Sequence, residues 1–164
     1  MSLPRNTQAA ENSVLYVFDK LPPGAQKAIQ ECWDKFGGGK PHAIVAFRGQ
    51  LQLFGMNSVA HKKGADYYFE REFLEKAPED ILESVVAHEL AHAVDVMRDF
   101  DKALKEFLSP DRAATALSTP VERARRQILE LEERGLVEDG ADDRAAAWGF
   151  DIQAGKKWCR ENIK

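Results

Sequence analysis

The chain has 164 residues, of which 44% are hydrophobic and 30% are charged, and its formal net charge is −4. This length and composition allow one sizeable core, so we expect a single domain over residues 1–164, and the negative charge argues against nucleic acid as the main partner. No apolar run approaches the roughly 20 residues of a membrane span, and the N-terminus lacks the charged-then-apolar profile of a signal peptide. The sequence therefore predicts a cytoplasmic protein without a membrane partner.

The N-terminal third predicts a helical region. Residues 1–13 are polar and are expected to be loose, and the short apolar run Val14–Phe18 follows them. The pattern from Pro22 to Phe36 predicts a helix with proline near its first turn. Three consecutive glycines, Gly37–Gly39, are expected to end it.

The next stretch favours β-structure. Residues 42–54 predict two strands around a turn near Arg48 and Gly49. Residues 66–73 are rich in aromatic side chains and predict a further strand directly before the next helix. The aromatic residues Tyr67, Tyr68 and Phe69 lie on this last strand.

A buried amphipathic helix is predicted over residues 79–98. Pro78 precedes it, and Glu79 and Asp80 in its first turn suit the helix dipole. Apolar residues recur at 3.6-residue spacing through Ile81, Leu82, Val85, Val86, Ala93, Val94 and Met97.

The C-terminal half is predicted to be mainly helical. Thr119, Pro120 and Glu122 have the pattern of a helix start, and Gly135 is expected to end that helix. A final helix is expected over residues 139–162. The fold class expected from these elements is α+β, with a short mixed sheet packed on the 79–98 helix.

The run from His88 to His92, with Glu89 after the first histidine, is the strongest functional signal in the chain. On a helix, positions i and i+4 share a face, so both imidazoles can reach one metal with the glutamate beside them. This is the pattern of zinc hydrolases, in which the glutamate is the general base. Two partly buried structural histidines are the simpler interpretation, but that does not explain the glutamate.

A catalytic zinc usually has three protein ligands and an open position for water. The two other histidines, His42 and His61, lie upstream, so we expect the third ligand to be a carboxylate. Asp95 lies about 10 Å of helix rise beyond His88, too far to join both histidines at one ion. It is expected to support the ligands from behind or to make a polar contact at the helix end.

A second acidic segment, Glu138-Asp139-Gly140-Ala141-Asp142, follows on the expected final helix. With the histidine motif, it resembles the gluzincin branch of the zinc metallopeptidases, and residues 88–95 (HELAHAVD) look like the corresponding segment of the anthrax lethal-factor-like peptidases. The resemblance covers about residues 66–150. It implies a zincin-like fold, zinc ligation by His88, His92 and Glu138, and Asp142 as the residue that orients His88.

Two features depart from that family pattern, and the acidic segment also has an ordinary explanation. Gly140 makes the start of the helix near Glu138 uncertain, so Asp142 or Asp143 is an alternative ligand. An acidic cluster of this kind is also an ordinary solvated helix entry. The lethal-factor-like peptidases use a tyrosine near the third ligand, whereas no tyrosine follows His92 here, which leaves Arg144 as a weak substitute.

The expected activity is peptide-bond hydrolysis by a Zn²⁺-dependent metallopeptidase with Glu89 as general base and a peptide or protein as substrate. By resemblance to zincins, the strand before the motif helix would be an exposed sheet edge, with Tyr67, Tyr68 and Phe69 contacting the substrate by backbone pairing. Two other functions stay open. The chain is then either a zinc-binding structural or regulatory module without catalysis, or an interaction domain with a chance motif.

Overall fold

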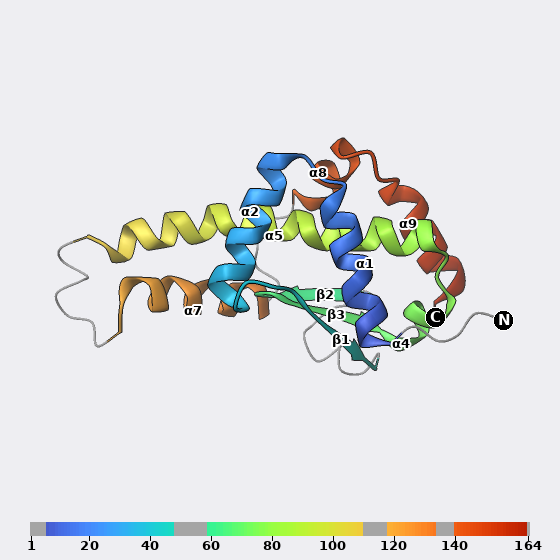
Figure 1. The fold of residues 1–164 in the computed structure, drawn as a ribbon, viewed down its shortest axis with the longest axis horizontal. Helices are drawn as coiled ribbons and strands as arrows, with labels where there is room; N and C mark the ends of the chain where they lie inside the picture. Colours follow the sequence, from blue (N-terminus) through green and yellow to red (C-terminus); the bar gives the residue numbers. More distant parts are fainter. Residues whose placement is uncertain (1–5, 48–58, 110–117, 134–139, 164) are drawn as a thin grey trace.

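The computed structural model describes residues 6–47, 59–109, 118–133 and 140–163. Within these ranges the fold is α+β, with a three-stranded mixed sheet packed against a long helix and a mostly helical C-terminal half (Figure 1). The strands are β1 (His42–Ala46), β2 (Ala60–Lys63) and β3 (Asp66–Glu70). The helices are α1 (Thr7–Asp19), α2 (Pro23–Phe36), α4 (Arg71–Lys76), α5 (Glu79–Phe107), α7 (Pro120–Glu133), α8 (Ala141–Ala147) and α9 (Ile152–Asn162).

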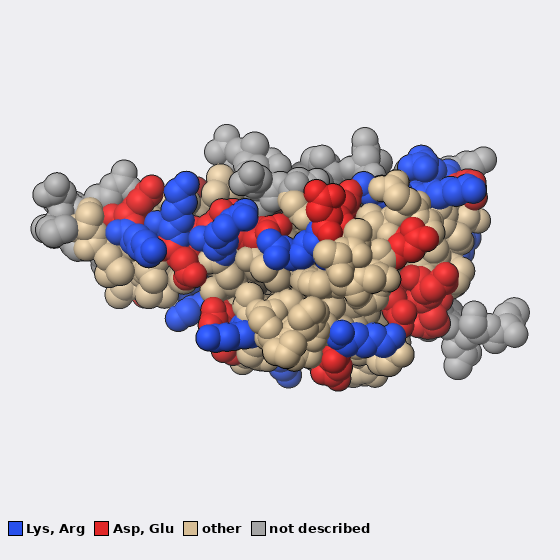
Figure 2. All heavy atoms as spheres, turned by 90° about the horizontal axis from the view of Figure 1, so that it is seen from above, with Lys and Arg blue, Asp and Glu red and all other residues tan. Residues whose placement is uncertain are grey.

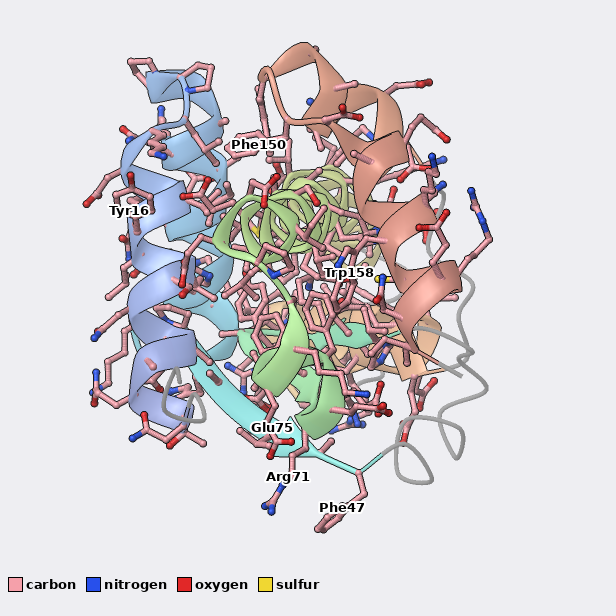
Figure 3. All side chains as sticks on the ribbon, turned by 90° about the vertical axis from the view of Figure 1, so that its right-hand side faces the viewer. Tyr16, Phe47, Arg71, Glu75, Phe150 and Trp158 are labelled. Carbon is pink, nitrogen blue, oxygen red and sulfur yellow. The ribbon has the colours of Figure 1, made fainter. Side chains whose placement is uncertain are left out.

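Helix α5 is the centre of the molecule. Viewed along its axis, α1 and α2 lie on one side of it, α8 and α9 lie on the other, and the sheet lies beneath (Figure 3). The helix begins at Glu79 as expected but continues beyond residue 98 to Phe107. It continues because Phe100, Ala103 and Phe107 extend its apolar stripe and are buried against α2 and α7.

The sheet has the order β1-β3-β2, with β3 parallel to β1 and antiparallel to β2. The expectation that the strand before α5 forms a sheet edge is therefore wrong, because Tyr68 on β3 pairs with Ile44 on one side and His61 on the other. The predicted strand is also shorter than expected, since Arg71 already begins α4. Among the described residues, β1 and β2 are the outer strands.

Helix α1 begins at Thr7, so the expectation of a loose segment over residues 1–13 is wrong for its second half; residues 1–5 lie outside the described ranges. The side chain of Asn6 accepts a hydrogen bond from the backbone N–H of Ala9 and caps the helix. Ala10, Val14 and Val17 follow at helical spacing and are buried. Burial of this stripe stabilises a helix whose first turn is polar.

The helix predicted from Thr119 is confirmed as α7, and Thr119 accepts a hydrogen bond from the N–H of Glu122 at 3.2 Å. The single final helix expected over 139–162 is instead two helices, α8 and α9. Gly149 adopts φ +96°, which ends α8 in a conformation that disfavours other residues. Asp151 then starts α9 by accepting a hydrogen bond from the N–H of Ala154.

Helix α9 packs closely against the core. Trp158 lies on its inward side, and its ring meets Phe73 edge-on with 6.1 Å between centroids (Figure 3). Gly155 faces α5, where an added Cβ would lie 2.5 Å from the hydroxyl of Ser84. Ser84 is buried and donates a hydrogen bond to the carbonyl of Ile81, so its hydroxyl is not free to move aside.

A buried ion pair joins the outer strand β2 to α7. The ammonium of Lys62 lies 2.6 Å from Glu132, and the two side chains are only 1% and 3% exposed. Lys62 also donates to the carbonyl of Gly64, and the N–H of Gly64 donates to the second oxygen of Glu132. We call these three residues the closed cluster; each charged group in it has hydrogen-bond partners.

The surface seen in Figure 2 carries interspersed acidic and basic side chains. At the bottom of the molecule in Figure 3, near α4, the guanidinium of Arg71 lies 4.9 Å from the ring centroid of Phe47. Within the described ranges, no helix combines the length and the apolar character that crossing a membrane requires.

Candidate metal centre

His88 and His92 lie one turn apart on α5, and their side chains converge. Their Nε2 atoms are 3.1 Å apart, and the rings are nearly perpendicular with 4.6 Å between centroids. Two nitrogen ligands at about 2.0–2.1 Å from a tetrahedral zinc ion would be roughly 3.3 Å apart. The two imidazoles are therefore spaced as a pair of zinc ligands requires.

The other ring nitrogen of His88 faces α8. Its Nδ1 lies 2.7 Å from Oδ1 of Asp142, with the two side chains 25% and 30% exposed, although neither atom makes a well-aligned hydrogen bond with any described group. A carboxylate in this position favours the tautomer with the proton on Nδ1, which leaves the Nε2 lone pair available for a metal. This is the contact between Asp142 and His88 that the resemblance implied.

Asp142 is also paired with Lys156 of α9, through its second oxygen. Burial tends to raise the pKa of Asp142, but the Lys156 ammonium and His88 outweigh burial and hold the pKa below its ordinary value of 3.8. Asp142 is therefore a carboxylate at neutral pH. It lies between an imidazole on one side and an ammonium on the other.

Glu89 is buried at 6% exposure on α5, next to His88 in sequence. His61, on the outer strand β2, is also buried. Burial lowers the pKa of His61 below its ordinary value of 6.5, and Glu89 and Glu132 offset this only in part, so His61 is neutral at pH 7. The charge of Glu89 raises this pKa and that of His92 lowers it. Sequence reasoning considered His61 as a ligand but did not place it on a strand beside the motif helix.

Asp95 is buried within α5 rather than at a helix end, because the helix continues to Phe107. One of its oxygens accepts a hydrogen bond from Arg144 of α8 at 2.8 Å. Among the described residues, its second oxygen has no hydrogen-bond partner, and neither has Nε of Arg144. Asp95 thus ties α8 to α5 through its hydrogen bond with Arg144. Arg144, which the sequence offered in place of a tyrosine, is therefore paired with Asp95.

The third ligand is not found among the described residues, which contain no group of three His, Cys, Asp or Glu side chains placed to hold one metal ion. Glu138, the expected ligand, lies outside the described ranges. Of the two alternatives, Asp142 contacts Nδ1 of His88 and not its Nε2, and Asp143 is exposed. The described part of the site therefore consists of two imidazoles with one supporting carboxylate.

The three residues expected to contact substrate have different environments. Tyr67 and Phe69 are fully buried, and the hydroxyl of Tyr67 accepts a hydrogen bond from the indole of Trp33 at 3.0 Å. Tyr68 is half-buried, with its ring 6.3 Å from that of His61. The structure thus brings Tyr68 near His61 but places Tyr67 and Phe69 in the core.

Comparison of the chain with protein-family models, with characterised proteins and with solved structures gives no significant match. Its function is therefore inferred from the residues of the candidate metal centre.

Proposed function

We propose that the chain is a zinc-dependent metallopeptidase with a zincin-like fold. The observation that carries the proposal is the convergence of the His88 and His92 Nε2 atoms at 3.1 Å, with Asp142 behind the first of them. In the metal-free chain the two Nε2 atoms are also at hydrogen-bond distance, so one imidazole can donate to the other, and a metal ion would take the place of that shared proton. Glu89 between them adds the one side chain that peptide hydrolysis requires as a base.

The residues fit zinc in kind as well as in spacing, since neutral imidazole nitrogens are common zinc ligands and a carboxylate behind one of them is their usual support. His88 and His92 would hold the ion, with Glu138 as the proposed third ligand. When bound, zinc would supply a Lewis acid and a water of lowered pKa. Glu89 would accept the proton of the attacking water and deliver it to the leaving amine.

The metal is tested first, by measuring bound zinc after dialysis of the wild-type chain and of His92→Ala, Glu138→Ala and, as a matched control, His42→Ala. We expect about one zinc per chain in the wild type and in His42→Ala, and loss in the other two variants. Retention in Glu138→Ala would move the third ligand elsewhere. No zinc in the wild type, even with excess metal, would leave an interaction domain with a chance motif.

Catalysis is tested with Glu89→Gln and a peptide library. A matched control is Glu106→Gln, an exposed glutamate near the far end of the same helix. We expect Glu89→Gln to keep zinc and fold but to lose cleavage by at least 100-fold, within the range that acid-base catalysis contributes, while Glu106→Gln keeps full activity. A wild-type chain that binds zinc but cleaves no peptide would favour the structural or regulatory module.

A further inference from the structure

Among the described residues of the candidate metal centre, Lys156 contacts Asp142. Asp142 has two carboxylate oxygens, and they point to different partners: Oδ1 toward His88 on α5 and Oδ2 toward Lys156 on α9. Three helices thus meet in a row of three side chains. The order along this row is ammonium, carboxylate, imidazole.

The far end of the row is fixed by packing. Lys156 follows Gly155, where α9 lies so near α5 that an added Cβ would be 2.5 Å from the Ser84 hydroxyl, and Trp158 lies against Phe73. The side chain of Lys156 is 47% exposed, so it is not held by burial of its own. Its position comes from the docking of α9, and its charge is directed at one oxygen of Asp142.

We infer that Lys156 is a positioning residue for the metal centre: it holds Asp142 so that the other carboxylate oxygen faces Nδ1 of His88. A carboxylate on a short helix has several rotamers, and α8 has only seven residues. Pairing one oxygen with an ammonium carried by a second helix favours the rotamer that faces His88. This inference deepens the proposed function, since the His88 side chain that Lys156 orients is one of the proposed ligands.

The consequence is a choice of tautomer. If Asp142 faces His88, the imidazole proton stays on Nδ1, and the Nε2 lone pair points toward His92. If Asp142 turns away, the proton is free to move to Nε2, where it blocks metal binding. Lys156 would therefore determine whether His88 is ready to bind a metal before any metal arrives.

The test is the tautomer of His88 in the zinc-free chain, read from ¹⁵N chemical shifts and two-bond couplings of the imidazole. It is measured at about pH 8, above the ordinary histidine pKa of about 6.5. The variants are Lys156→Met, Lys156→Arg, Asp142→Ala and, as the matched control, Lys157→Met, which changes the exposed lysine next along α9. The His88 signals are assigned with a His88→Gln chain, and thermal unfolding confirms that each variant is folded.

We expect the proton on Nδ1 in the wild type, in Lys156→Arg and in Lys157→Met, and a substantial Nε2–H population in Lys156→Met and Asp142→Ala. Zinc affinity should fall in Lys156→Met by less than the 10- to 100-fold loss typical of removing a group that contacts a ligand directly. A His88 tautomer that is unchanged in Lys156→Met but altered in Asp142→Ala would overturn the role of Lys156. This readout needs no metal, so a chain that binds no zinc would refute the proposed function separately.

Discussion

The closed cluster and the candidate metal centre differ in how completely their polar atoms are paired. In the closed cluster, Lys62 and Glu132 are at most 3% exposed, and both share hydrogen bonds with the backbone of Gly64. In the candidate metal centre, His88 and Asp142 are 25% and 30% exposed, and atoms of both lack a well-aligned hydrogen bond among the described residues. Full pairing at complete burial is what a structural group requires, whereas in the candidate centre two partly exposed side chains meet and the Nε2 atoms of His88 and His92 converge at 3.1 Å.

The largest effect is expected in the closed cluster. Glu132→Ala leaves the Lys62 ammonium buried without its counter-charge, which should lower the free energy of unfolding by about 3–5 kcal/mol. Urea denaturation measures this. The matched control is Glu133→Ala, whose partner Lys63 is 3.4 Å away and whose side chain is 53% exposed, so we expect a loss of no more than about 1 kcal/mol. Equal losses in the two variants would remove the distinction between closed cluster and surface.

In the candidate metal centre, a substitution should change zinc affinity more than it changes the stability of the zinc-free chain. Asp142→Ala should weaken zinc binding by about 10- to 100-fold, or about 1.4–2.7 kcal/mol, because the support of His88 is lost. The stability of the zinc-free chain should change by less than in Glu132→Ala, since Asp142 is partly exposed. Competition with a chelator gives the affinity. Asp143→Ala is the control, and a larger loss there than in Asp142→Ala would identify Asp143 as a ligand.

Alkaline pH distinguishes the two groupings further. Burial alone would lower the pKa of Lys62, but the Glu132 carboxylate outweighs it and raises the pKa above its ordinary value of 10.5. A raised lysine pKa contributes stability that is fully present below pH 10.5 and is lost as the pH rises through the folded-state value. We therefore expect the stability difference between the wild type and Lys62→Met/Glu132→Leu to be constant from about pH 7 to 10 and to shift in favour of the double variant above 10.5. A stability difference that stays constant at higher pH would show that the pKa of Lys62 is the same in the folded and unfolded states.

The smallest effect is expected for the same double variant at pH 7. Replacing a buried ion pair by apolar residues of similar size is often neutral or stabilising, so we expect a free energy of unfolding within about 1–2 kcal/mol of the wild type or above it. The denaturation midpoint and slope provide the measurement. A loss as large as that in Glu132→Ala would mean that the hydrogen bonds to Gly64 contribute more than the charges do.

Much of the fold was predictable because periodic burial and caps are local signals. Helices α2 and α7 begin close to where Pro22 and Thr119 predict, and α5 begins at Glu79. The order of strands was not predictable, because it depends on which strands pair and no local pattern in Tyr67–Phe69 reports that β1 and β2 lie on either side. The break at Gly149 was missed because a single glycine inside an apolar pattern is often tolerated in a helix.

The site residues likewise fall into those that local spacing predicts and those that depend on tertiary packing. The placement of His88 and His92 on one face follows from their spacing, and it is found in the structure. The approach of Asp142 to His88 came from a resemblance, not from the residues alone, because tertiary packing brings together two residues that are 54 positions apart (142 − 88) in the sequence. Lys156 was not anticipated at all, since an exposed lysine on a C-terminal helix has no sequence signal that separates it from Lys157.

Gly155 has a consequence for how the chain tolerates mutation. A single methyl group there would act as a wedge between α9 and α5, because its position lies 2.5 Å from the Ser84 hydroxyl. In a mutational scan scored by the amount of folded protein, Gly155 would rank with the buried core positions although it carries no side chain. Sequence variation in this chain would thus be restricted not only at the proposed metal centre but also at the contact that sets the spacing between two helices.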